Sequence, residues 1–142
     1  VYLPRVMPAV EPPRAELYYV FRNEFWKLPK NHAEIVQSVR WALNGARVSV
    51  AAPDWVTVES TQQPQRNRYL VHLLNYKVSP AVLNAVVKLR LPTGKKLREV
   101  VAESPDAAKA APLRFTLQGD AAAVTLPRLD VYSVVVFQLE DL

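Results

Sequence analysis

The amino-acid sequence predicts a mainly β protein: an antiparallel, immunoglobulin-like β-sandwich of about eight strands, preceded by an extended N-terminal arm and one α-helix. Three observations predict this class. The hydrophobic period changes from that of a helix to that of a strand after Gly45. Turn residues then recur about every ten residues, as in sandwiches. Nothing in residues 46–142 resembles the crossover helix that a parallel sheet needs.

The N-terminal part is expected to be irregular up to one helix. Residues 1–14 contain Pro4, Pro8, Pro12 and Pro13, and proline fixes φ and removes a hydrogen-bond donor, so we expect an extended arm. Residues 17–28 are rich in aromatic side chains, and we expect a short strand followed by a loop.

A helix is predicted over residues 32–43. Asn31 is expected to cap it, with Glu34 at the spacing of a capping box. Ile35, Val39 and Leu43 fall on one helical face. The helix is expected to stop at Asn44-Gly45, because glycine accepts the left-handed backbone of a helix end.

Strands are predicted where hydrophobic residues alternate between turns. They are residues 47–51, 55–59, 69–76, 86–91, 97–102, 113–117, 123–126 and 132–139. The segments 69–76 and 132–139 are apolar on both faces, which indicates central strands covered on both sides.

Charge is distributed unevenly along the chain, whose formal net charge is +5. Residues 60–98 hold no acidic residue, and the acidic residues resume at Glu99. One interpretation is that neighbouring strands attract one another; the other is a basic patch for an anionic partner, such as nucleic acid, an acidic sugar or another subunit. Nucleic acid is disfavoured because no aromatic residue alternates with Lys88 and Arg90. The patch would comprise Arg66, Arg68, Lys88, Arg90, Lys95, Lys96 and Arg98.

Motifs that carry chemistry are missing from the sequence. It contains no GxGxxG, GxxxxGK[ST], GxSxG or HExxH, and its lack of cysteine excludes a disulfide framework and a thiolate metal site. His32 and His72 are isolated from other potential ligands, so no metal or cofactor is predicted. We predict no catalytic residue, because the serines look like turn or strand residues and Glu99 and Glu103 lie on one strand without a cleft.

Aromatic residues within the sandwich offer a further possibility. Their rings could form a stacking platform for sugars, or they could serve core and edge packing. The candidates are Trp55, Tyr69, Tyr76 and Tyr132. No apolar run approaches the roughly 20 residues that a membrane-spanning helix needs. The sequence is compatible with either a cytoplasmic or a periplasmic location.

Three segments carry a resemblance to a known family. They read NHAEIVQSVRWALNG at residues 31–45, VSVAAPDWVTVESTQQ at 48–63 and RYLVHLLNY at 68–76. These segments are similar to the C-terminal region of glycosidase-like proteins related to family 42 β-galactosidases, and residues 126–139 resemble the closing strand of that region.

The resemblance implies a division into two parts. Residues 1–45 would be the end of a trimerisation-like domain, and residues 46–142 an accessory β-sandwich. The catalytic carboxylates of that family lie in a barrel outside this sequence, so none is carried over. The function implied is a non-catalytic accessory domain for stability, assembly or substrate placement, with an upstream domain or another subunit as partner. The alternatives are a carbohydrate-binding module and an interaction domain that docks an acidic partner. Since the chain starts at Val1, we expect a fragment or a processed product.

Overall fold

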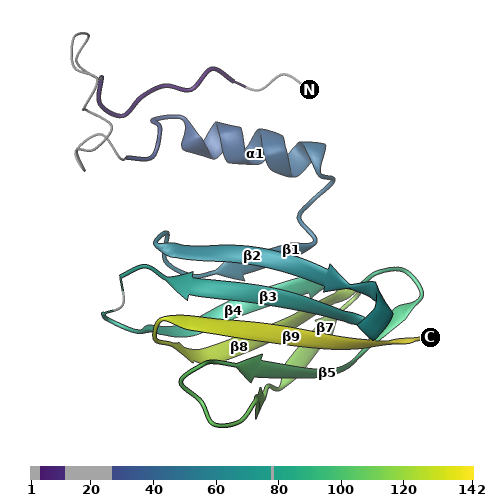
Figure 1. The fold of residues 1–142 in the computed structure, drawn as a ribbon. Helices are drawn as coiled ribbons and strands as arrows, with labels where there is room; N and C mark the ends of the chain where they lie inside the picture. The colour runs from purple at the N-terminus through teal and green to yellow at the C-terminus, as the bar shows by residue number, and fades with distance from the viewer. Residues whose placement is uncertain (1–3, 12–26, 78) are drawn as a thin grey trace. The chain divides into compact units, whose positions relative to one another are not determined.

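The mainly β fold is confirmed by the computed structural model, which describes residues 4–11, 27–77 and 79–142 (Figure 1). These residues form nine strands in two antiparallel sheets, together with one α-helix and a single 3₁₀ turn, η3 (Pro64–Arg66). The chain consists of two compact units, residues 1–46 and residues 47–142. The strands are β1 (Val48–Ala51), β2 (Val56–Gln63), β3 (Arg68–Asn75), β4 (Val82–Arg90), β5 (Lys95–Glu103), β6 (Ala111–Pro112), β7 (Phe115–Gln118), β8 (Ala121–Leu129) and β9 (Tyr132–Asp141).

The predicted helix is present as α1 (His32–Ala42), and Asn31 holds the N-cap position as predicted, but the expected side-chain capping bond is absent. Asn31 makes no side-chain bond to the helix. Its Oδ1 accepts a hydrogen bond from the Met7 N–H at 2.9 Å, and its Nδ2 donates to the Arg5 carbonyl at 2.8 Å. The amide therefore fastens the start of the helix to residues 5–7, which carry neither helix nor strand, as predicted for the arm. Residues 17–26 of the predicted aromatic segment lie outside the described residues.

The sandwich consists of a four-stranded sheet in the order β1-β4-β8-β7 and a five-stranded sheet in the order β2-β3-β9-β5-β6. All neighbouring strands are antiparallel. In immunoglobulin constant domains the first strand neighbours the second. Here β1 neighbours β4 and β2 lies in the other sheet, so the strand order differs from that arrangement.

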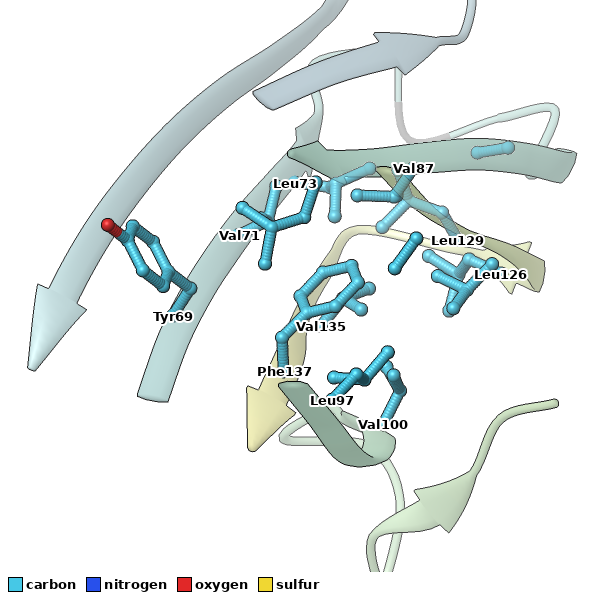
Figure 2. Close-up of a cluster of buried hydrophobic side chains, with 14 of the residues drawn as sticks. Tyr69, Val71, Leu73, Val87, Leu97, Val100, Leu126, Leu129, Val135 and Phe137 are labelled. Carbon is cyan, nitrogen blue, oxygen red and sulfur yellow. The ribbon is translucent and has the colours of Figure 1, made fainter. Parts of the chain in front are cut away.

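The core fills the space between the two sheets (Figure 2). Alternation along β3 sends Tyr69, Val71 and Leu73 inward, and Val71 and Leu73 are fully buried. Phe137 from β9 lies opposite Tyr69 in the register and is also fully buried. Each fully buried aliphatic or aromatic side chain of this kind stabilises the fold by roughly 1.5–3 kcal/mol.

The second face of β3 is less covered than the sequence predicts. Leu70 and Leu74 are only half-buried, although the strand is central within its sheet. On β9, Val136 is 5% exposed yet stands apart from the core cluster, on the outer face. The apolar pattern on both faces therefore reflects the central position of these strands within one sheet. Their inner face is covered by the other sheet, whereas their outer face is covered only in part, by neighbouring side chains.

Candidate functional site

The four aromatic candidates do not form one platform. Trp55 directly precedes β2, Tyr76 directly follows β3 and Tyr132 begins β9, which places all three at one end of the five-stranded sheet. The Tyr76 N–H donates to the Trp55 carbonyl at 3.3 Å, and Tyr132 lies opposite Leu74 in the register. We call Trp55, Tyr76 and Tyr132 the aromatic end. Tyr69 lies at the start of β3, toward the opposite end.

Only one side chain of the aromatic end is freely exposed. Tyr76 is 68% exposed, whereas Trp55 and Tyr132 are half-buried. The Lys77 ammonium lies 3.7 Å from the Trp55 ring centroid, in a cation–π contact. That ammonium occupies one face of the indole, and the buried indole Nε1 has no hydrogen-bond partner among the described residues.

Tyr132 is engaged with a histidine. The two rings stack with centroids 6.2 Å apart, and the Tyr132 hydroxyl lies 2.7 Å from His72 Nδ1. Ser133 does not approach this pair, because it lies opposite the core residue Leu73 and is 4% exposed. A histidine held by a phenol, with the neighbouring serine on the other face of the strand, lacks the geometry of a nucleophilic triad.

A buried amide organises the backbone at the aromatic end. Asn75 is 1% exposed and its N–H donates to the Val131 carbonyl at 2.8 Å. Its Nδ2 donates to the Asp130 carbonyl at 2.8 Å and to that of Pro80 at 3.3 Å, while its Oδ1 accepts from the Lys77 N–H at 3.2 Å. The side chain thus joins the turn after β3 to the turn before β9.

A pocket of about 170 Å³ lies at the other end of the sandwich. Its walls come from the β2–η3–β3 connection, from the turn between β4 and β5, and from the last part of β9. Pro64, Pro92 and Leu139 supply apolar surface. The polar lining comprises Gln62, Asn67, Arg68, Tyr69, Thr93 and Lys95.

The positive charge of Lys95 is neutralised within the chain. Its ammonium donates to Asp141 Oδ1 at 2.5 Å and to Asn67 Oδ1 at 2.8 Å. Asn67 has a left-handed backbone with φ 48°, a conformation that asparagine tolerates better than most residues. Its carbonyl accepts the Leu139 N–H at 2.7 Å, so this turn is tied to both β5 and β9.

Tyr69 is the most buried of the polar residues that line the pocket. The residue is 7% exposed, and its ring belongs to the core cluster. Its hydroxyl points away from the other labelled core side chains (Figure 2). No described residue forms a hydrogen bond with this hydroxyl.

The predicted basic patch is divided between the two sheets. Lys88 and Arg90 lie on β4 in the four-stranded sheet, whereas Arg66, Arg68, Lys95, Lys96 and Arg98 belong to the five-stranded sheet or to its β2–β3 connection. Lys96 pairs with Glu140 at 3.4 Å and Arg98 with Glu99 at 2.6 Å. With Lys95–Asp141, two of these pairs join basic β5 to acidic β9, in agreement with the interpretation that neighbouring strands attract one another.

Sequence reasoning missed the partners of the candidate residues. Neither Lys77 nor Asn67 was among the candidate residues predicted from the sequence. Their roles depend on register, which brings residues 28 positions apart in the sequence into contact at Lys95–Asn67. Within the described residues, no group of three or more histidine, aspartate or glutamate side chains could hold a metal ion. The described part of the chain also holds no helix long and apolar enough to cross a membrane.

The fold and these two ends define a class of protein: a two-sheet antiparallel β-sandwich with a small polar pocket at one end. No protein-family model and no curated protein matches the chain. Among solved structures, it is similar to α-L-fucosidase isoenzyme 2 from Paenibacillus thiaminolyticus, with a TM-score of 0.61 and 21% identity over 76% of this chain and 18% of that one. A cycloisomaltooligosaccharide glucanotransferase from Paenibacillus sp. matches with a TM-score of 0.48 and 18% identity over 75% of this chain. The chain spans about a fifth of the length of both, 18% and 20%.

Proposed function

We propose that this chain is a non-catalytic accessory β-sandwich domain of a glycosidase-like protein, in which it serves stability, assembly or substrate placement. The observation that carries the proposal is the fold similarity to α-L-fucosidase, which aligns 76% of this chain with 18% of that enzyme's chain. A match of this kind supports a sandwich that is one part of a longer polypeptide. The partner implied is an upstream domain or another subunit.

A relationship to family 42 β-galactosidases is the finer form of this proposal. It rests on the sequence motifs at residues 31–45, 48–63 and 68–76, the last of which forms β3.

The experiment uses an antiserum raised against the purified 142-residue chain. In an extract of the source cells we expect the antiserum to detect a polypeptide much larger than 16.0 kDa. On chromatography, this polypeptide should elute in the fractions that hydrolyse an aryl glycoside. A native polypeptide of 16.0 kDa would overturn the accessory role.

The purified chain itself is the second arm of the test. We expect it to hydrolyse none of a panel of aryl α- and β-glycosides. Turnover that survives repurification, and that is abolished by a substitution within the chain, would contradict the non-catalytic part of the proposal.

A further inference from the structure

We propose that the pocket beside Tyr69 binds a neutral, hydroxyl-bearing ligand of the size of one sugar ring, such as the terminal residue of a glycan. The choice of a sugar among ring-sized ligands rests on the function proposed above. The site itself rests on the pocket's size, its charge and the hydrogen-bonding groups that line it.

Size is the first argument. The pocket volume is about 170 Å³, below the roughly 300–1,000 Å³ of pockets that hold drug-sized ligands. One ring therefore fits, whereas a chain of rings would have to extend into solvent. The apolar walls at Pro64, Pro92 and Leu139 suit the C–H faces of a sugar ring.

Charge is the second argument. The Lys95 ammonium that lines the pocket is already paired with Asp141 and hydrogen-bonded to Asn67. Arg68 also lines the pocket, and its Nε already donates to Gln63 Oε1 at 2.6 Å. The polar lining therefore favours a neutral ligand over an anion.

Hydrogen-bonding capacity is the third argument. A hydroxyl group both donates and accepts, as do the Gln62 amide, the Thr93 hydroxyl and the Tyr69 hydroxyl. Tyr69 is 7% exposed, and its hydroxyl has no partner among the described residues. The hydroxyl is therefore available to donate to or accept from a ligand hydroxyl in the pocket.

The test is a titration of the ¹⁵N-labelled 142-residue chain with glucose, galactose and mannose, followed by NMR. We expect at least one of them to shift the backbone amides of Gln62, Asn67 and Thr93 saturably, with a Kd on the order of 1 mM. Glucuronate, which adds a carboxylate, is expected to bind more weakly than the best neutral sugar, and cyclohexanol, with one hydroxyl, more weakly still.

Tyr69→Phe removes only the hydroxyl, and we expect it to raise the Kd about three- to tenfold. Tyr132→Phe is the matched control at the aromatic end and should leave the Kd unchanged. Gln62→Leu, on an exposed edge strand outside the core, is a second variant that should weaken binding without affecting the fold. The inference is overturned if no neutral sugar shifts the pocket amides, if glucuronate or cyclohexanol binds as tightly, or if folded Tyr69→Phe and Gln62→Leu proteins bind like the unsubstituted chain.

Failure of this inference is distinguishable from failure of the proposed function. If the native polypeptide is long and carries glycosidase activity but no sugar reaches the pocket, only the binding site is wrong. If sugars bind the pocket and the native polypeptide is 16.0 kDa, only the accessory role is wrong.

Discussion

Single residues hold the ends of this sandwich together, and Asn75 is the clearest case. We expect Asn75→Ala to lower the free energy of unfolding by about 1–3 kcal/mol, because it leaves buried backbone groups of Lys77 and Asp130 without their partner. Urea denaturation measures this. Gln118→Ala, at an exposed position on β7, is the control and should stay within about 0.5 kcal/mol of the unsubstituted protein. Equal midpoints for the two variants would show that the amide contributes nothing.

A second residue-scale prediction concerns pH. The Arg128 guanidinium donates to both carboxylate oxygens of Asp130, from Nε at 3.0 and 2.9 Å and from Nη2 at 2.6 Å. These hydrogen bonds hold the pKa of Asp130 below its usual value of 3.8. Because the folded-state pKa is depressed, the pair stabilises the fold above the unfolded pKa, and the contribution is lost as the pH falls below about 4 and through the folded pKa.

The pair can be checked by an NMR titration of the Asp130 carboxyl carbon. In Arg128→Met the pKa should rise toward its usual value, whereas Lys88→Met should leave it unchanged. High salt should reduce the shift, since both side chains are exposed. An Asp130 pKa that does not respond to Arg128→Met would contradict the assignment.

Elements differ in how much of their hydrophobic surface they bury. Leu73 on β3 is fully buried, whereas Leu83 on β4 is 61% exposed. We expect Leu73→Ala to cost about 2–5 kcal/mol because it leaves a cavity, and Leu83→Ala about 0.5 kcal/mol or less. Denaturant midpoints at constant m-value measure both. A similar cost for the two variants would mean that the space between the sheets is not the core.

Elements with regular alternation were predictable, and irregular ones were not. The segment 69–76 corresponds to β3 within one residue at each end, because Tyr69, Val71 and Leu73 alternate without interruption. β4 starts at Val82, four residues before the predicted strand, since Asn84 adopts φ 56° and breaks the period. Opposite this break the register skips Pro127, which has no N–H to donate.

Polar and alanine-rich strands also escaped the periodicity. β2 continues through Thr61 to Gln63 as an exposed edge strand, where no core selects hydrophobic residues. β6 consists of two residues, Ala111 and Pro112, within a segment predicted as a connection. The pocket could not be predicted from periodicity at all, because Gln62, Asn67 and Lys95 meet only through strand register.

At the scale of the whole molecule, the core determines which part should fold alone. Every residue of the core cluster lies between Tyr69 and Leu139, within the unit that starts at Arg47. We expect residues 47–142 to fold without residues 1–46 and to unfold in one cooperative transition, as single domains of this size do. Circular dichroism and calorimetry of the truncated chain measure this. A truncated chain that binds a hydrophobic dye and lacks a cooperative transition would contradict the prediction.

The place of β9 in the sheet bears on how the protein is made. It is the last strand in the sequence, yet it lies between β3 and β5 in the five-stranded sheet. Until residues 132–141 have left the ribosome, β3 and β5 have no common neighbour, and their open edges could pair with another nascent chain. Because β9 joins β3 to β5, the five-stranded sheet can close only after residues 132–141 have been synthesised, at about 5–20 residues per second.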